Sequence, residues 1–196
     1  MDLNILIWVN NNMHSSGILN NIWKFITSTG DTGFIWIILC IIMLFNKHTR
    51  KAGVVMTLSL AMTYVMCDIV LKNIIMRARP FENNSEFFDF INSVGYKLPD
   101  SSSFPSGHAA SSFAVTYALF ICDKKCGKLS LIWAILVALS RIYMCVHYPT
   151  DVFAGIMLGF VIAHVASLIV NYIQKYYCMK YMRYIKVNSM LKRRNA

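Results

Sequence analysis

The sequence carries unusually little charge for its length. Of its 196 residues, only 14% are Asp, Glu, Lys or Arg, whereas 57% are hydrophobic, and the mean hydropathy is +0.50. A soluble domain usually has about 25% charged residues. This shortage argues against a water-soluble domain and favours the lipid bilayer as the main solvent. The length fits one domain.

Other features are missing as well. The N-terminus has no basic segment and is followed by three asparagines at 10–12, so we expect no cleaved signal peptide. There is no internal repeat and no long low-complexity tract. Cys122 and Cys126 could be half of a metal site, but no second ligand pair follows at zinc-like spacing. We therefore interpret the six cysteines as reduced thiols and expect neither a metal ion nor a cofactor.

The positive charge lies beside the apolar runs. The net charge is +10, which could indicate a nucleic-acid partner, but most of the Lys and Arg residues fall at 47–51, at 124–128 and in the tail after residue 174. Cytoplasmic loops of membrane proteins carry this excess of positive charge. We therefore expect no nucleic-acid partner, and we place these three segments in the cytoplasm.

The apolar runs predict an all-α integral membrane bundle. A helix needs about 20 residues to cross the bilayer core, and five spans are clear, at 33–45, 52–75, 109–122, 129–146 and 152–173. We expect residues 1–31 to form N-terminal interfacial helices, or alternatively a sixth, irregular span. The core would then cover 32–174 and a basic cytoplasmic tail 175–196. The oligomeric state is open.

Alternation of these spans places the remaining polar segments, 77–108 and 147–150, on the extracytoplasmic face. Between residues 81 and 104, phenylalanines alternate with acidic residues. This stretch is either a short helix in the membrane interface or a solvated connector.

The first polar motif is Lys72-x6-Arg79-Pro80. A separation of seven residues is two helical turns, so we expect both cations on one helix face, with Pro80 ending the helix. Together they suit phosphate oxygens, although two cations at a helix end are common. We interpret Asp68, one turn before Lys72, as its ion-pair partner.

The second motif, Pro105-Ser106-Gly107-His108, opens the third span. Ser106 is a candidate N-cap, and Gly107 lets a ligand approach the backbone closely. The start of a helix binds anions, and His108 could protonate a leaving oxygen. Alone, this motif would indicate no more than a capped helix.

The third motif is Ser140-Arg141-x5-His147-x3-Asp151. An arginine within an apolar span indicates function by default, and we expect Arg141 to meet an anion. A carboxylate from Asp151 on Nδ1–H of His147 would leave Nε2 free to attack phosphorus. A structural His–Asp pair that caps a helix is the alternative.

Together, these motifs resemble the signature of the type-2 phosphatidic acid phosphatase superfamily, the membrane lipid phosphatases. All three patterns match without substitution over about residues 52–173. The short chain and outward site are most similar to the bacterial undecaprenyl-diphosphate phosphatases of that superfamily.

The resemblance implies a metal-independent hydrolase acting on a lipid phosphate or diphosphate. It implies that His147 forms a phosphohistidine, supported by Asp151, and that His108 protonates the leaving group. The implied ligands of the phosphoryl oxygens are Lys72, Arg79, Ser106, Gly107 and Arg141.

Several functions remain open at this point. The first is hydrolysis of a polyprenyl diphosphate, undecaprenyl diphosphate, to its monophosphate. The alternative substrates are phosphatidic acid and phosphatidylglycerophosphate. A vanadate-dependent haloperoxidase is disfavoured because those relatives are soluble. A non-catalytic binder of anionic lipid would not need both imidazoles.

Overall fold

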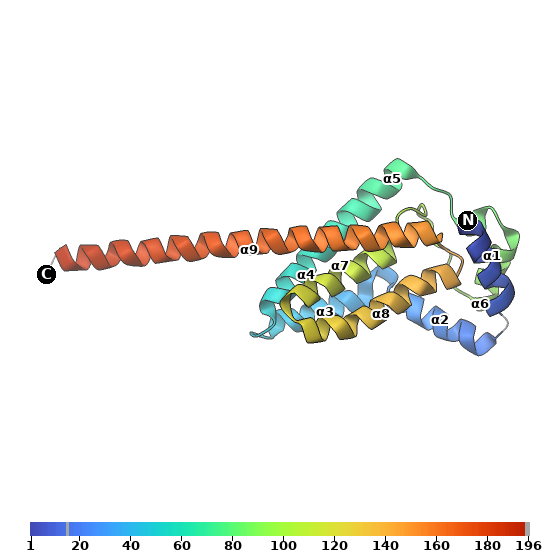
Figure 1. Cartoon of the computed structure of the whole chain (residues 1–196), viewed down its shortest axis with the longest axis horizontal. Coiled ribbons are helices and arrows are strands. Elements are labelled where there is room, and N and C mark those ends of the chain that lie inside the picture. Colours follow the sequence, from blue (N-terminus) through green and yellow to red (C-terminus); the bar gives the residue numbers. More distant parts are fainter. Residues whose placement is uncertain (15, 195–196) are drawn as a thin grey trace.

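The computed structural model describes the backbone of residues 1–14 and 16–194 and the side-chain packing as far as Met182. The described part is helical, which agrees with the all-α prediction (Figure 1). Its elements, in chain order, are α1 (Asp2–Met13), α2 (Gly17–Thr29), η1 (Asp31–Gly33), α3 (Phe34–Phe45), α4 (Arg50–Thr63), η2 (Tyr64–Leu71), α5 (Lys72–Ile75), η3 (Pro80–Glu82), α6 (Ser85–Val94), α7 (Gly107–Cys122), α8 (Lys124–Tyr143) and α9 (Pro149–Arg194).

Helix α7 is the centre of the bundle and packs against α4, α8 and α9. Two glycines allow α9 to approach it closely. A Cβ atom on Gly155 would lie 2.5 Å from the carbonyl oxygen of Ser106, and one on Gly159 would lie 2.6 Å from that of Ala110. Small residues one turn apart commonly let membrane helices pack this tightly. The contact fixes the start of α7, where the second motif lies, against α9, which carries Asp151.

The helices agree with the five predicted spans in position but not all in length. By length and composition, three helical segments could cross a membrane: Arg50–Glu82, Lys124–Tyr143 and Pro149–Met182. Helix α7, with 16 residues, is shorter. Apolar side chains remain exposed on the outer faces of the bundle, among them Ile41 and Val161. A bilayer would cover these faces, as expected for a membrane bundle.

The first crossing differs from the sequence prediction. Helix α2, which we expected to lie in the interface, continues through η1 into α3 with a bend of 49°, and the bent pair together is long and apolar enough to cross a membrane. The break arises because Thr32 and Gly33 both have positive φ angles, 54° and 71°. By length and composition this pair is either a broken span or a re-entrant loop, so the interfacial helices of residues 1–31 and the boundary at residue 31 stay predictions.

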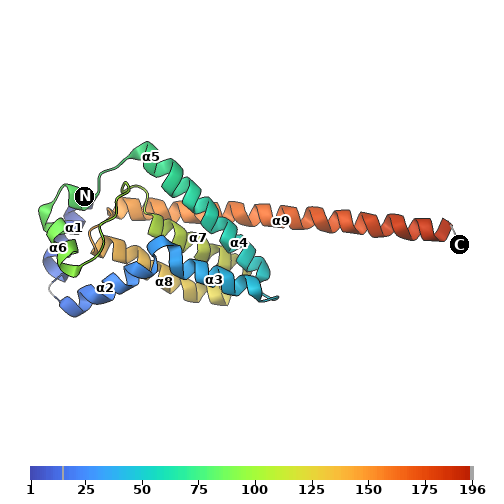
Figure 2. The same ribbon diagram turned by 180° about the vertical axis from the view of Figure 1, so that it is seen from behind.

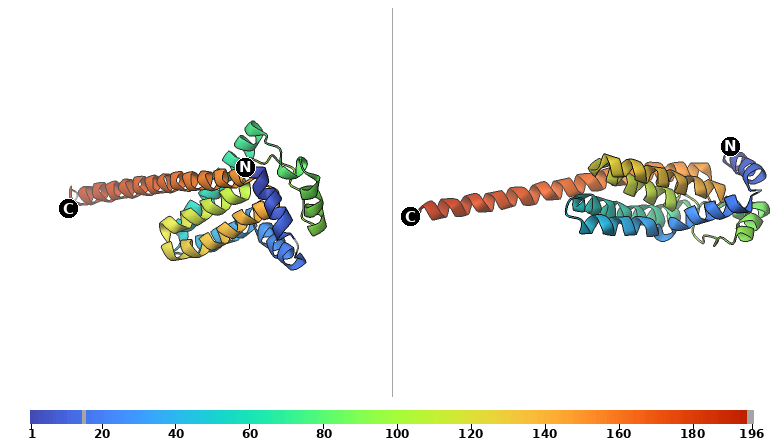
Figure 3. Two further views of the ribbon diagram at one scale, coloured as in Figure 1. Left: turned by 45° about the vertical axis from the view of Figure 1, so that its right-hand side comes forward. Right: turned by 90° about the horizontal axis from the view of Figure 1, so that it is seen from below.

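The two ends of the bundle have different character. The turn between α3 and α4 and the turn between α7 and α8 lie at one end, from which α9 projects as a single long helix (Figures 1 and 2). The N-terminus, α1 and α6 lie at the other end (Figure 3). The basic segments at 47–51 and 124–128 therefore share one end, as predicted. The side chains of the tail from residue 183 onward lie outside the described residues.

Residues 81–104 contain a short helix, α6, which was one of the two sequence interpretations. Asn84 caps its start by accepting hydrogen bonds from the backbone of Glu86 and Phe87, and Gly95 ends it with a φ of 66°. Its apolar face, with Phe87 and Ile91, packs with α1 and the end of α8. Helices α1 and α6 thus form a small second core beside the site.

Candidate active site

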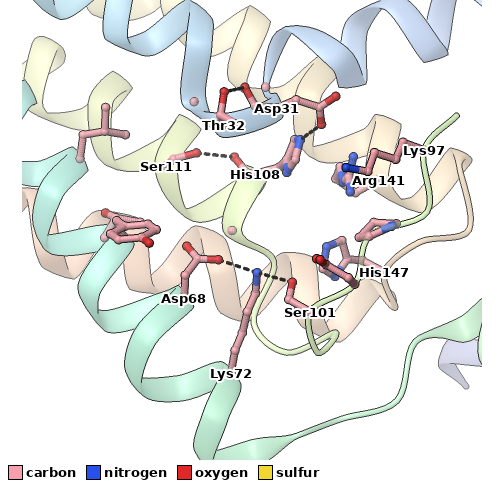
Figure 4. Close-up of a pocket in the computed structure, with 18 of the residues that line it drawn as sticks. Asp31, Thr32, Asp68, Lys72, Lys97, Ser101, His108, Ser111, Arg141 and His147 are labelled. Carbon is pink, nitrogen blue, oxygen red and sulfur yellow. Dashed lines mark hydrogen bonds and ion pairs between the residues drawn. The ribbon is translucent and has the colours of Figure 1, made fainter.

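The three motifs converge on one cavity of about 730 Å³. Its lining includes six of the eight predicted site residues. Figure 4 shows Lys72, Arg141 and the two imidazoles around a common space. These six are Lys72, Arg79, Gly107, His108, Arg141 and His147. The other two, Ser106 and Asp151, are fully buried directly behind them. The sequence therefore identified a set of residues that the fold brings together.

Lys72 and Arg79 meet in a different way from the one predicted. Helix α5 ends at Ile75, Met76 has a left-handed φ of 46°, and Arg79 is extended. Our prediction that Lys72 and Arg79 share one helix face is therefore wrong. A residue before proline is disfavoured in the helical region, which accounts for the extended Arg79, and the left-handed Met76 ends the helix before it. The chain then folds back and returns Arg79 to the cavity.

The contacts of Lys72 show how this cation is held. Its Nζ atom lies 2.6 Å from a carboxylate oxygen of Asp68 and 3.2 Å from Oγ of Ser101. The first contact confirms the predicted ion pair. Asp68 lies in η2, a π-helix, and such segments often occur at functional sites.

Arg79 is buried and held by main-chain oxygens. Nε donates to the carbonyl of Ser101 at 2.6 Å, and Nη1 donates to that of Val146 at 2.9 Å. The same Nη1 lies 3.3 Å from Nε2 of His147. A guanidinium has no acceptor, so Nε2 must accept here. In neutral His147 the proton then resides on Nδ1.

Arg141 is also buried, as predicted for a functional intramembrane arginine. Its Nη1 donates to the hydroxyls of Thr27, at 2.5 Å, and Tyr96, at 2.7 Å. Its Nε is buried and has no partner among the described residues. A buried charged donor without an acceptor is costly, so an anion at this end of the cavity would satisfy it.

The start of α7 faces the cavity. Ser106 occupies the N-cap position, as predicted, but its side chain makes no capping hydrogen bond, and within the described chain its buried Oγ has no partner. A Cβ atom on Gly107 would lie 3.4 Å from the Asp68 carboxylate and 3.6 Å from Nζ of Lys72. Glycine therefore keeps the helix start open to a ligand, where the helix dipole favours an anion.

The hydrogen bond predicted between His147 and Asp151 is not formed. Nδ1 of His147 lies 3.7 Å from Oδ2 of Asp151, beyond hydrogen-bond range, and has no partner in the described structure. That oxygen accepts instead from Oγ of Ser103 at 2.5 Å and from the backbone N–H of Tyr148 at 3.0 Å. The carboxylate is thus fixed in place beside the imidazole, without contacting it.

Arg77, which was not among the predicted site residues, holds the other oxygen of Asp151. Nη1 of Arg77 donates to Oδ1 at 2.5 Å, and Nη2 bonds Asp2 of α1 at 3.1 Å. Burial acts to raise the pKa of Asp2, but hydrogen bonds from Thr150 and Arg77 outweigh it, so this pKa lies below its ordinary value. The charged form of Asp2 ties α1 to the buried Asp151.

His108 has a partner that the sequence analysis missed. Its Nε2 lies 2.9 Å from Oδ1 of Asp31, which also accepts from the hydroxyl of Tyr96 at 2.8 Å. One signal was present in the sequence, because Asp31 is a lone acid between two apolar patches. An acid in such a position usually meets a partner.

One wall of the cavity is apolar. Residues of α3 and α4 contribute Ile37, Leu60 and Ala61, and Tyr64 follows at the start of η2. Lys97 adds a fourth cation to the lining and is exposed (Figure 4). A cavity with charged groups on one side and an apolar wall on the other suits an amphiphilic phosphate.

Within residues 1–14 and 16–182, no three His, Cys, Asp or Glu side chains converge in a way that could hold a metal ion. All six cysteines, which lie in this part of the chain, are free. The cavity offers cations and imidazoles where a metal site would offer acidic ligands, and this donor set suits an anion bound directly by the protein.

Known proteins have similar sequences. The family model described as the PAP2 superfamily matches residues 51–175. An undecaprenyl-diphosphatase of Sulfolobus acidocaldarius is 35% identical over 153 residues, which cover 76% of this chain and 69% of the relative. A lipid A 4'-phosphatase of Bacteroides thetaiotaomicron is 29% identical over 169 residues, covering 81% and 72%.

The fold is shared as well. The crystal structure of a transmembrane PAP2-type phosphatidylglycerolphosphate phosphatase from Bacillus subtilis superimposes with a TM-score of 0.65 at 26% identity, covering 89% of this chain and 85% of the other. The family model spans more than half of the chain, and a relative above 30% identity is matched over most of its length. The chain therefore belongs to the PAP2 superfamily and is a membrane phosphatase of that family.

Proposed function

We propose that the protein hydrolyses a polyprenyl diphosphate, undecaprenyl diphosphate, to its monophosphate and inorganic phosphate at the extracytoplasmic face of the membrane. The observation that carries this proposal is the convergence of two imidazoles and three cations on a cavity with an apolar wall. Phosphoryl transfer requires mainly positioning and stabilisation of charge, and this cavity supplies both.

His147 is the nucleophile in this proposal. The contact from Arg79 places the lone pair of neutral His147 on Nε2, on the side of the cavity. A phosphoryl group offers anionic oxygens, which are better acceptors for the guanidinium than an imidazole. Binding of substrate would therefore draw Arg79 onto the phosphate and free Nε2 to attack phosphorus. Asp151, 3.7 Å from Nδ1, would stabilise the positive ring of the phosphohistidine.

The remaining groups of the site bind the phosphate and protonate the leaving group in this proposal. Lys72, Arg79 and Arg141 would contact the phosphoryl oxygens, together with Ser106 and the backbone at Gly107. His108 would donate a proton to the leaving oxygen as the P–O bond breaks. Water would then attack the phosphohistidine, with neutral His108 taking its proton. No step needs a metal ion or a cofactor.

A diphosphate is the proposed substrate for two reasons. The relatives with similar sequences include one named as an undecaprenyl-diphosphatase, and Lys97 adds a fourth cation at the exposed edge of the cavity, where a second phosphate would lie. The positive-inside pattern supports a cavity on the outer face and a tail in the cytoplasm. A polyprenyl lipid that has released the group it carried would present its diphosphate on this face.

A glycerolipid monophosphate, phosphatidic acid or phosphatidylglycerophosphate, is the second candidate. One similar solved structure is that of a phosphatidylglycerolphosphate phosphatase, and three cations would serve one phosphate equally well. Charge alone does not separate the two substrates.

A side-by-side comparison decides between them. Phosphate release by detergent-solubilised protein is measured with undecaprenyl diphosphate, phosphatidic acid and phosphatidylglycerophosphate in one detergent. We expect the highest kcat/KM for the diphosphate. In Lys97→Ala the preference for the diphosphate over the glycerolipids should be about tenfold weaker, because one charge-assisted contact is lost. A preference for either glycerolipid would refute undecaprenyl diphosphate as the main substrate, but the protein would still be a lipid phosphatase.

A further inference from the structure

The carboxylate of Asp31 lies at the centre of a hydrogen-bonded group inside the cavity. Its Oδ1 is 2.9 Å from Nε2 of His108 and accepts from the hydroxyl of Tyr96 at 2.8 Å. That hydroxyl in turn accepts from Nη1 of Arg141 at 2.7 Å. A hydroxyl that accepts a hydrogen bond from arginine and donates one to a carboxylate is oriented by both. Figure 4 shows Asp31 beside His108.

The backbone around Asp31 is shaped to receive His108. A Cβ atom on Gly30 would lie 2.7 Å from Cδ2 of His108 and 3.1 Å from Cγ1 of Val137, so any other residue would push the imidazole away. Thr32 has a φ of 54°, which is unfavourable for a β-branched residue. This conformation turns the chain at the 49° bend between α2 and α3 and leaves Asp31 in the cavity.

We propose that Asp31 is a positioning residue for His108, so that each imidazole of the site works with its own carboxylate. This inference rests on the proposed function. Asp31 lies outside residues 51–175, which the family model matches, and in the bend between α2 and α3. The N-terminal region therefore supplies part of the active site.

The pairing assigns the two nitrogens of His108. Nε2–H donates to Asp31, which leaves Nδ1 for the substrate. In the first step Nε2 of His147 forms a bond to phosphorus, the P–O bond to the leaving group breaks with its electron pair, and Nδ1–H of cationic His108 gives its proton to that oxygen. In the second step neutral His108 takes a proton from water at Nδ1, while the water oxygen bonds to phosphorus and the P–N bond breaks. Asp31 stays ionised throughout and stabilises the cationic ring.

Asp31 acts through His108 and is not proposed as a ligand of the phosphate. Its side chain is 45% exposed and that of His108 is 17% exposed, so the carboxylate faces the same space that must receive an anion. Its charge opposes phosphate binding. An acid at this position must offset the unfavourable effect of its charge on phosphate binding, and orientation of the general acid His108 would do so.

The test compares leaving groups. Phosphatidic acid releases an alkoxide, which needs a proton, whereas para-nitrophenyl phosphate releases a stabilised phenolate that needs little help. For Asp31→Asn we expect kcat/KM, which reports transfer to His147, to fall about 10- to 100-fold with phosphatidic acid, within the range of general acid catalysis. With para-nitrophenyl phosphate it should fall by less than about threefold. Asp31→Glu, which keeps the carboxylate, should recover part of the loss.

Two further variants control the comparison. Asp89→Asn removes an exposed carboxylate of α6 with the same change in charge and should match the wild type on both substrates. The double variant Asp31→Asn/His108→Ala should be no slower than His108→Ala, because Asp31 has no imidazole left to position.

Equal losses on both substrates, no loss, or additive losses in the double variant would overturn the inference while leaving the phosphatase intact. Absence of turnover by the wild type on every substrate would overturn the proposed function and this inference together. If Asp31→Asn fails to fold, the ratio of the two losses in Asp31→Glu decides: a selective loss with phosphatidic acid supports the inference, and any other result refutes it.

Discussion

At the scale of single residues, the proposed reaction depends on which nitrogen of His147 carries the proton. Arg79 meets Nε2 and Asp151 lies on the side of Nδ1. Asp151 is held by Arg77, Ser103 and the backbone of Tyr148, so its position does not depend on the imidazole. The carboxylate can stabilise the ring without being moved by it.

We therefore expect different results from two substitutions. His147→Ala removes the nucleophile and should abolish turnover, by about 10³-fold or more. Asp151→Asn keeps the nucleophile but loses the charge beside it, so a small residual activity should remain. Phosphate release with each variant checks this, alongside the thermal unfolding midpoint. His147→Ala that turns over well would contradict the mechanism.

The residues that sequence analysis found and missed differ in one respect. His108, Arg141 and His147 belong to motifs whose members lie within a few residues of one another along the chain. Asp31 and Arg77 reach the site only through the folding of distant segments, 77 residues from His108 and 74 from Asp151. Spacing along the chain cannot show such contacts.

At the scale of elements, the close contact of α7 and α9 sets the geometry of the site. Gly155 lies one turn after Asp151, and the backbone N–H of Ser106 donates to the carbonyl of Asp151 at 3.0 Å. Any side chain at residue 155 would separate the second motif from the third.

Gly155→Ala should therefore lower both stability and activity. Its Cβ would meet the backbone oxygen of Ser106 at 2.5 Å, and overpacking of this kind costs about 1–3 kcal/mol. Gly17→Ala is the matched control, because nothing lies within 4 Å of the added atom. Thermal unfolding and phosphate release measure the effects. A Gly155→Ala variant as stable and active as Gly17→Ala would show that the helices are less tightly packed than described.

The hydropathy of the sequence predicted the positions of the helices, but it did not predict where the helices end or bend. The runs that predicted spans correspond to α3, to α4 with η2 and α5, and to α7, α8 and α9. The end of α5 at Ile75 and the bend at Thr32 depend on left-handed residues, Met76 and Thr32, which are not the glycines that usually mark such turns. These features shape the cavity, so the way Lys72 and Arg79 meet could not be predicted.

At the scale of the whole molecule, the basic loops and the cavity lie toward opposite ends of the bundle. The basic loops share one end (Figure 1). The cavity is lined by residues 96–101, which follow α6, and so lies toward the other end. This arrangement supports the proposal that the cavity faces outward.

Labelling of intact cells tests the orientation. A single cysteine at Ser93, exposed on α6, should react with an impermeant maleimide, whereas Cys126 as the single cysteine should react only after permeabilisation. Labelling of Cys126 but not of residue 93 would place the cavity in the cytoplasm and remove the case for an outer-leaflet substrate.

The central claim, that His147 carries the phosphoryl group, is tested most directly by trapping the intermediate. Solubilised protein is mixed with undecaprenyl diphosphate labelled in its terminal phosphate and quenched in alkali, in which phosphohistidine survives, and the modified residue is located by mass spectrometry. We expect the label on His147, its absence in His147→Ala, and its accumulation in His108→Ala, where water is no longer activated. Turnover without a labelled His147, or a label on another residue, would contradict the account.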